Sequence, residues 1–156
     1  MPRSFKSTQQ YLKPDPKFGS LLASKIINKI MLDGKKGAAQ GILYDAMALV
    51  CAKIEGDPGE ILAKAIANVK PRVEVRSKRV GGATYQVPRE VNTRRQQSLG
   101  IRWLVDAARA KRGKPMHRRL AEEIFDAYNS QGVAVTKREN VHKMAEANSA
   151  YSHFSW

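Results

Sequence analysis

Features that mark secreted, membrane and metal-binding proteins are scarce in this chain of 156 residues. Its one cysteine, Cys51, excludes a disulfide framework and a C-x-x-C metal site, and we expect it to be a small core residue. The three histidines, His117, His142 and His153, are not spaced as a set of metal ligands. No apolar run approaches the roughly 18 residues of a membrane helix, and the first residues contain no apolar signal core. We therefore expect a cytoplasmic protein with no cofactor and no membrane association.

Catalytic motifs are also absent from the sequence. There is no Walker loop, no G-x-S-x-G and no H-E-x-x-H. The pair Gly81-Gly82 has expected strands on both sides, so it lacks the context of a phosphate-binding glycine loop. The acidic residues Glu122, Glu123 and Asp126 are expected to form a solvated helix face or local ion pairs. The sequence thus predicts that the chain is not an enzyme and takes no small-molecule substrate.

Basic residues, by contrast, are abundant and unevenly placed. The formal net charge is +14, with 28 Lys and Arg against 14 Asp and Glu. Residues 70–119 hold 15 of these basic residues against 3 acids, and residues 1–36 hold 8 against 2. A surface that serves only solubility interleaves both signs, whereas concentrated positive charge indicates a face that binds a polyanion.

The most basic stretch, residues 70–95, has the pattern of a β-hairpin. Val73 and Val75 alternate with charged residues, and Tyr85 and Val87 form a second alternating run. The glycine pair at 81–82 between the runs suits the positive φ angles of a tight turn.

A two-residue turn would set Arg76 opposite Val87 and Glu74 opposite Arg89. This register places the two valines of the first run on the face opposite Tyr85 and Val87, so the hairpin lacks one apolar face unless a bulge shifts it. Two strands alone are only marginally stable in water. We interpret the hairpin as an arm that binds RNA.

The rest of the chain has helical periodicity, with apolar residues at spacings of three and four. Two starts carry capping signals, namely Asp57 with Glu60 and Thr136 with Glu139. The expected helices run from Ser20 to the stop at Asp33-Gly34, from about 38 to 54, from Asp57 to the residue before Pro71, from Asn92 or Thr93 to about 110, from Pro115 onward, and from Thr136 onward. The residues expected to face the core are Leu22, Ile26, Ile27, Ile30, Ile42, Leu43, Ala46, Leu49, Val50, Ile61, Leu62, Ala65, Ile66, Val69, Leu99, Trp103, Leu104, Ala107, Ala108, Leu120, Ile124, Phe125, Tyr128, Val141, Met144, Ala145 and Tyr151.

The predicted fold is mainly α, a single bundle of about six helices with one protruding β-hairpin between the third and fourth. We expect one RNA-binding domain over residues 1–156, with a basic tail at 1–19, the hairpin arm at 72–91, and a C-terminal helix and tail at 136–156. In the tail, basic residues interleave with aromatic ones, which suits backbone contacts and base stacking, although such a tail can also be disordered until it binds. His117, Arg118 and Arg119 add positive charge at the start of the fifth helix, against its dipole, which phosphate would neutralise.

Two other binding functions compete with this interpretation. A helix-turn-helix DNA-binding protein would concentrate its charge on one recognition helix, whereas here the charge spreads over a tail, loops, a hairpin and a helix. A general RNA chaperone would have the same charge without a unique binding site. The distributed charge favours a folded RNA that is recognised by shape and phosphate.

Five segments, PDPKFGS, LDGKKG, NVKPRVEVRSKRVGGATYQVPREV, IRWLVDAARAKRGKPM and AVTKRENVHKMAEANSAYSHFSW, together resemble the family of small-subunit ribosomal protein seven in its bacterial form. The resemblance runs nearly end to end. It implies a structural role in translation: binding to the 3′ major domain of the small-subunit ribosomal RNA, nucleation of head assembly, and a place beside the exit-site tRNA and the mRNA. It also implies small-subunit ribosomal proteins nine and eleven as partners.

Carried over to this sequence, the resemblance implies two sets of contact residues. The set implied for ribosomal RNA is Arg3, Lys6, Lys35, Lys36, Arg76, Lys78, Arg79, Arg94, Arg95, Arg102, Lys114 and Arg118. The set implied for the side that faces tRNA and mRNA is Val80, Gly81, Gly82, Ala83, Thr84, Tyr85, His142, Lys143 and the tail from Tyr151 to Trp156. The family usually opens with a denser arginine cluster than this chain, so we expect fewer phosphate contacts from residues 1–7.

Overall fold

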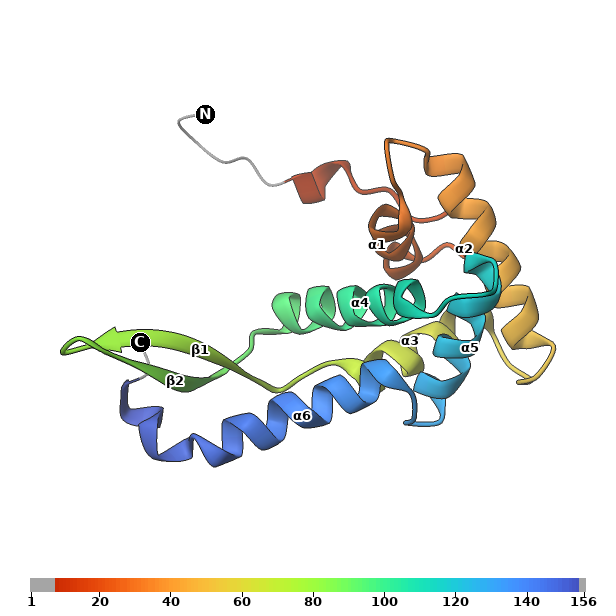
Figure 1. Ribbon diagram of the computed structural model, residues 1–156. Helices are drawn as coiled ribbons and strands as arrows, with labels where there is room; N and C mark the ends of the chain where they lie inside the picture. The colour runs from red at the N-terminus through yellow and green to blue at the C-terminus, as the bar shows by residue number, and fades with distance from the viewer. Residues whose placement is uncertain (1–7, 155–156) are drawn as a thin grey trace.

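The computed structural model describes residues 8–154 and consists, over that range, of helices and one antiparallel hairpin (Figure 1). The elements are η1 (Thr8–Tyr11), α1 (Leu21–Ile30), α2 (Lys36–Cys51), α3 (Pro58–Val69), β1 (Val73–Val80), β2 (Ala83–Glu90), α4 (Thr93–Ala110), α5 (Met116–Tyr128), α6 (Val133–Ala147) and η2 (Ser149–Phe154). The hairpin extends away from the other helices, and α6 runs beside it (Figure 1). The predicted mainly helical fold with a hairpin between the third and fourth helices is confirmed.

Local signals fixed the starts of three helices. The Ser20 hydroxyl accepts hydrogen bonds from the first turn of α1, and the Asp57 carboxylate accepts one from the Glu60 amide at 3.1 Å. Asn92 does the same for the amide of Arg95 at 2.9 Å. Each side chain satisfies an amide that has no partner within its own helix. The remaining boundaries differ by at most a few residues from the expected ones, because the last turns of a helix often fray or tighten.

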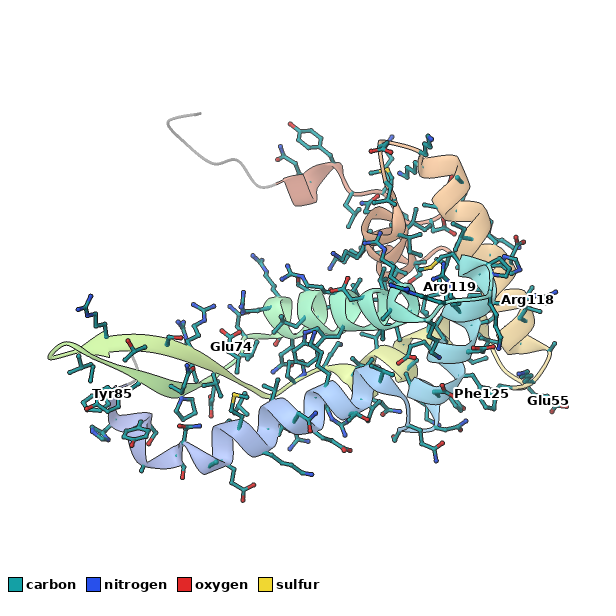
Figure 2. The ribbon with its side chains drawn as sticks, in the orientation of Figure 1. Glu55, Glu74, Tyr85, Arg118, Arg119 and Phe125 are labelled. Atoms are coloured by element: carbon teal, nitrogen blue, oxygen red, sulfur yellow. The ribbon has the colours of Figure 1, made fainter. Side chains whose placement is uncertain are left out.

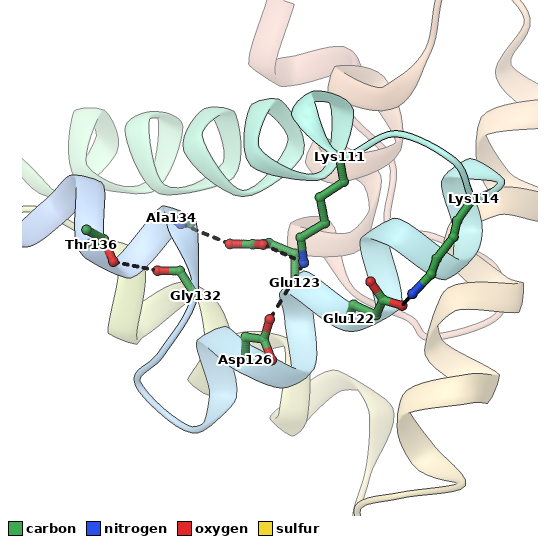
Figure 3. Close-up of polar contacts among 8 residues, drawn as sticks. All are labelled: Lys111, Lys114, Glu122, Glu123, Asp126, Gly132, Ala134 and Thr136. Atoms are coloured by element: carbon green, nitrogen blue, oxygen red, sulfur yellow. Dashed lines mark hydrogen bonds and ion pairs between the residues drawn. The ribbon is translucent and has the colours of Figure 1, made fainter.

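The start of α6 was predicted wrongly. Thr136 is not its cap; the helix begins three residues earlier, after Gly132 at φ 92°, and the Thr136 hydroxyl donates to the Gly132 carbonyl at 3.0 Å. The amide of Ala134 donates instead to a carboxylate oxygen of Glu123 on α5, at 2.9 Å (Figure 3). A distant side chain thus supplies the acceptor that the predicted capping box of Thr136 and Glu139 would have supplied.

One apolar core joins all six α-helices. Trp103 is 8% exposed and belongs to it, as predicted. Three residues expected in the core are exposed instead: Leu49 at 41%, Met144 at 52% and Tyr151 at 37%. Met144 lies on the part of α6 that runs beside the hairpin (Figure 1). Its neighbour Ala145 is 5% exposed, so this part of α6 buries one face, and Met144 lies outside that face. Cys51 is half-buried against the core.

The hairpin has the predicted register without a bulge. Arg76 pairs with Val87 and Glu74 with Arg89, and a two-residue turn at Gly81 (φ 57°) and Gly82 (φ 90°) joins the strands. The face that carries Val87 and Tyr85 is covered by α6 and η2. The hairpin therefore acquires an apolar face through the C-terminal part of the chain rather than through its own second face. No helix within residues 8–154 is long and apolar enough to span a bilayer.

Candidate nucleic-acid interface

Three arginines are bonded to the carbonyl groups at the ends of neighbouring helices. Arg109 donates to the carbonyls of Lys29 and Ile30, at 3.1 and 3.2 Å, where α1 ends. Arg119 donates to two carbonyls where α4 ends, and Arg138 donates to the carbonyl of Asn68 near the end of α3. The last carbonyls of a helix have no partner inside it and form the negative end of its dipole, so a guanidinium there stabilises the fold.

A second group of charges lies where α4, α5 and α6 meet, and is called the junction below (Figure 3). Glu123 is fully buried, and the Lys111 ammonium lies 3.0 Å from it and 3.6 Å from Asp126. Burial alone would lower the pKa of Lys111, but the hydrogen bond to Glu123 and the nearby carboxylates outweigh burial and raise the pKa. Of the predicted acidic cluster, the ion pairs are therefore present, but a solvated face is wrong for Glu123.

Glu122, next along α5, pairs with Lys114. The hydrogen bond from Lys114 lowers the pKa of the Glu122 carboxyl. Lys114, expected to contact ribosomal RNA, thus has an intramolecular partner, and both side chains are substantially exposed.

Four basic side chains line a groove between α1 and α4, called the groove below. Its volume is about 290 Å³, and its lining consists of Lys25, Lys29, Arg94, Gln97, Ser98, Ile101 and Arg102. Lys25 donates to the side-chain oxygen of Gln97, and Lys29 lies 3.9 Å from Asp106. Within residues 8–154, Arg94 and Arg102 have no carboxylate partner. A concave surface with two guanidiniums that have no carboxylate partner suits phosphate groups.

The base of the hairpin is joined to α4 by one carboxylate. Glu74 lies near the base of the hairpin (Figure 2) and is 8% exposed. Its two oxygens lie 2.7 Å from the guanidiniums of Arg76 and Arg95, one each. Both arginines were expected to contact RNA. Their Nε groups are bonded to Glu74, while their side chains remain 40% and 45% exposed. The ion pairs therefore hold both guanidiniums at the base of the hairpin.

Other residues of the predicted ribosomal RNA set are spread over the surface. Lys35 and Lys36 lie at the start of α2, and Lys78 and Arg79 lie on β1. Arg118 lines a different groove, between α2 and α5, at the end of the molecule opposite the hairpin tip (Figure 2). The structure therefore does not bring Arg118 to the groove. Arg3 and Lys6 lie outside the described residues.

The predicted tRNA and mRNA set divides between the two ends of the hairpin. Near the tip, the Tyr85 ring lies 5.2 Å from that of Tyr151 and 5.4 Å from that of Phe154, and the Lys78 ammonium donates to the Phe154 carbonyl at 3.0 Å. These contacts join Tyr85 and Lys78 to η2, next to the turn residues Val80 to Thr84. Trp156 lies outside the described residues.

At the base of the hairpin, the Nε2 atom of His142 accepts a hydrogen bond from the amide of Arg72 at 3.0 Å. Burial and then the charges of Arg138 and Arg72 lower the pKa of His142. The lowered pKa favours the neutral imidazole, the form that can accept this bond. Lys143, next on α6, is exposed.

Sequence reasoning missed Lys25, Lys29 and Gln97 as groove residues. Lys25 and Lys29 are four apart, so they lie on one face of α1, and that spacing was a usable signal. Their proximity to Gln97 depends on how α1 packs on α4, which no local pattern specifies.

The sequence matches the family described as ribosomal protein S7p/S5e over residues 2–149. It is 52% identical over 154 residues to the small ribosomal subunit protein uS7 of Thermotoga neapolitana, with 99% of each chain covered. It is 53% identical over 156 residues to uS7 of Dictyoglomus turgidum and 51% to uS7 of Xanthobacter autotrophicus, with 100% of each chain covered. These matches confirm the predicted family, the absence of enzymatic function and the location in the cytoplasmic ribosome. The chain belongs to the ribosomal protein S7p/S5e family, and it is a structural component of the small ribosomal subunit.

Proposed function

We propose that the chain binds the 3′ major domain of the small-subunit ribosomal RNA and nucleates assembly of the head of the subunit. Family membership supports this proposal, and the groove between α1 and α4 is the observation that carries it. Arg94 and Arg102 bind phosphates there, with Lys25 and Lys29 on the facing helix. The chain acts as one RNA-binding domain over residues 1–156.

The mechanism is electrostatic and geometric. Phosphates crowd where RNA helices meet, and lysine and arginine side chains that neutralise them release condensed counterions. The helical core holds the basic side chains at fixed separations, so only an RNA with matching phosphate positions engages them together. Shape, rather than base sequence alone, thereby gives specificity.

Further contacts extend from the groove along the protein. Arg76 and Arg95 offer their terminal nitrogens while Glu74 holds their Nε atoms. The remaining residues proposed to contact ribosomal RNA are Arg3, Lys6, Lys35, Lys36, Lys78, Arg79, Lys114 and Arg118. Because Lys114 is paired and Arg118 lies in another groove, these two would contact a different RNA segment from that bound in the groove.

The hairpin tip and the C-terminal segment are proposed to face the exit-site tRNA and the mRNA. The aromatic contacts of Tyr85 with Tyr151 and Phe154 support a single surface made of both segments. His142 and Lys143 continue that surface along α6. Small-subunit ribosomal proteins nine and eleven are the proposed protein partners.

A filter-binding competition tests the main proposal. At about 150 mM monovalent salt, near physiological ionic strength, the 3′ major domain competes against a scrambled RNA of equal length and against duplex DNA. We expect a preference of roughly a hundredfold or more for the ribosomal fragment, within the range of specific over non-specific binding. Equal affinities that all collapse with added salt would reduce the protein to a non-specific basic surface.

A further inference from the structure

A second basic concave site lies at the base of the hairpin, separate from the groove. It is a pocket of about 400 Å³ between the end of α3, the segment that leads into β1, and α6. It shares no lining residue with the groove, and its lining consists of Ala67, Asn68, Lys70, Arg72, Arg138 and His142. Three of these residues are cations and none is a carboxylate, so the pocket is positively charged.

The wall of this pocket is held in place by hydrogen bonds. The Asn68 amide donates to the carbonyls of Ala127 and Tyr128, at 2.9 and 3.0 Å, and the Asn68 carbonyl accepts from Arg138. Arg138 also lies 3.3 Å from Glu139, which is exposed and outside the lining. The Arg138 guanidinium is therefore positioned before any ligand arrives, which reduces the entropy lost on binding.

The opposite side of the pocket carries cations without acidic partners. The backbone amide of Arg72 is bonded to His142, but within residues 8–154 neither the Arg72 guanidinium nor the Lys70 ammonium pairs with a carboxylate. Two such cations beside a fixed guanidinium form a site for an oxyanion with several charge-assisted hydrogen bonds.

We propose that this pocket binds a backbone phosphate of single-stranded RNA that lies along α6 between the base and the tip of the hairpin. This inference rests on the proposed function, because it continues the surface suggested for tRNA and mRNA to the base of the hairpin. The cations converge on one pocket, which suits one phosphodiester of a single strand better than the paired backbones of a duplex groove.

His142 lines this pocket, so its ring provides a signal from the site itself. The charged groups around the imidazole are Lys70 after α3, Arg72 before β1, and Arg138, Glu139 and Lys143 on α6. A phosphate in the pocket would offset the repulsion from the two guanidiniums, so binding should raise the pKa of His142. The His142 ring signal, identified by its loss in His142→Gln, can be followed by NMR in the full-length protein.

The experiment titrates the protein with a 12-nucleotide oligouridylate, which forms no stable duplex. We expect saturable movement of the His142 signal and a higher pKa. Arg72→Ala leaves the backbone hydrogen bond to His142 intact, and it should weaken the affinity reported by the signal by roughly two- to fivefold, the usual range for one exposed ion pair. The slope of log affinity against log salt should fall by about 0.7, as expected for one single-strand phosphate contact. Lys53→Ala, which removes one charge beside Phe125 from a residue that does not line the pocket, is the matched control and should change neither the affinity nor the salt slope.

Several results would overturn the inference. A His142 signal that does not move, or Arg72→Ala and Lys53→Ala variants with equal affinities, would mean that the pocket does not bind the strand. Inorganic phosphate that saturates the signal at the same phosphate concentration would make it a site for the free anion, and duplex RNA that binds equally well would overturn the preference for single strands. The competition with the 3′ major domain is run on the same variants, and Arg72→Ala should keep the preference for that fragment. Loss of the preference in the wild type would therefore count against the proposed function alone.

Discussion

Basic side chains line the groove and also lie around the end of α4, beside the junction, but the two sets contact different groups. At the junction, Lys111 lies against the buried carboxylate of Glu123, and at the nearby end of α4, Arg119 is bonded to main-chain carbonyls. In the groove, Arg94 and Arg102 have no carboxylate partner within residues 8–154. The first set stabilises the fold, and the second remains available to phosphate. Net charge cannot separate the two roles; the partners of each cation do.

Because the two sets of cations have different partners, their substitution should affect stability and RNA binding to different extents. Removing one member of a buried ion pair leaves the other charge uncompensated, which is strongly destabilising. Removing an exposed cation changes stability little but removes a phosphate contact and the counterion that it releases. Substitutions in the two regions should therefore affect different measurements, unfolding for the junction and salt-dependent binding for the groove.

The largest effect is expected for Glu123→Ala at the junction. It removes the partner of Lys111 and the acceptor of the Ala134 amide, so the free energy of unfolding should fall by about 3 kcal/mol. Urea unfolding followed by circular dichroism measures this free energy. Glu123→Gln keeps an acceptor for the Ala134 amide, so its free energy of unfolding should fall by less.

The control for this substitution is the next residue, Glu122→Ala. Its pair with Lys114 is exposed, so the expected loss is about 0.5 kcal/mol. If Glu123→Ala and Glu122→Ala were equally stable, burial would not be the reason that the Glu123 ion pair contributes to stability.

The next largest effect is expected in the groove. The double variant Arg94→Ala, Arg102→Ala should bind the 3′ major domain roughly 20-fold more weakly at 150 mM salt, with a salt slope lower by about 1.8, because two phosphate contacts are lost. Filter binding over a range of salt concentrations measures both quantities. Its unfolding free energy should stay near that of the wild type.

Arg119→Ala tests whether a cation that stabilises the fold also contributes to RNA binding. Like a groove substitution it removes one positive charge, but the Arg119 guanidinium is bonded to the carbonyls at the end of α4. We expect a less stable protein, by about 1–2 kcal/mol, with an unchanged salt slope. A slope that fell as it does for one groove arginine would show that Arg119 contacts RNA.

How far the sequence predicted this arrangement depends on the distance over which each feature is determined. Ser20, Asp57 and Asn92 cap their helices through amides two or three residues away, and Gly81-Gly82 sets the hairpin register, so local patterns sufficed. The start of α6 depends on Glu123, eleven residues before Ala134 and on another helix, so local patterns misplaced it.

The candidate site was predictable only in part for the same reason. The basic character of α4 and of the hairpin followed from composition, but Lys25 meets Gln97 across 72 residues of sequence through helix packing. Arg109 and Arg102 look alike in the sequence, yet one is bonded to the end of α1 and the other lines the groove. Only three-dimensional contacts separate a cation that stabilises the fold from one that is free to bind.

A smaller effect is expected at the hairpin tip. Tyr85→Ala removes the ring that contacts Tyr151 and Phe154, so η2 should detach at a loss of about 1 kcal/mol, the scale of aromatic pair contacts. Amide hydrogen exchange should become faster in residues 149–154 and stay slow in the helical core. The control is Thr84→Ala, because Thr84 is exposed on the other face of the hairpin. It should change neither the stability nor the hydrogen exchange of residues 149–154.

Replacing residues 77–86 by a short Gly-Ser turn removes the whole hairpin tip and tests whether the helical core folds without it. The helical core makes its contacts without this part of the hairpin, so cooperative unfolding should persist while RNA binding weakens. Loss of cooperative melting would mean that the hairpin tip is part of the core.

Arg95→Ala should have a smaller effect than either groove substitution. Its Nε lies 2.7 Å from Glu74, so its charge is already partly balanced, and the salt slope should fall by less than in Arg94→Ala. Stability should fall by up to about 1 kcal/mol, because Glu74 keeps only Arg76 as a partner. If the salt slope fell equally in Arg95→Ala and Arg94→Ala, Glu74 would have to release Arg95 when RNA binds.

The smallest effect is a pH dependence at the base of the hairpin. The pKa of His142 in the folded protein lies below its ordinary value of 6.5, because burial and the charges of Arg138 and Arg72 disfavour the protonated ring. The stabilisation that the neutral ring provides is therefore complete above pH 6.5 and is lost as the pH falls below that value toward the folded-state pKa. Unfolding at pH 7.5 and at pH 5.5 should thus differ more in the wild type than in His142→Gln, whose amide oxygen can still accept from Arg72 but does not titrate. His117→Gln is the control for histidine content, and equal pH dependence in the wild type and His142→Gln would remove His142 as the titrating group.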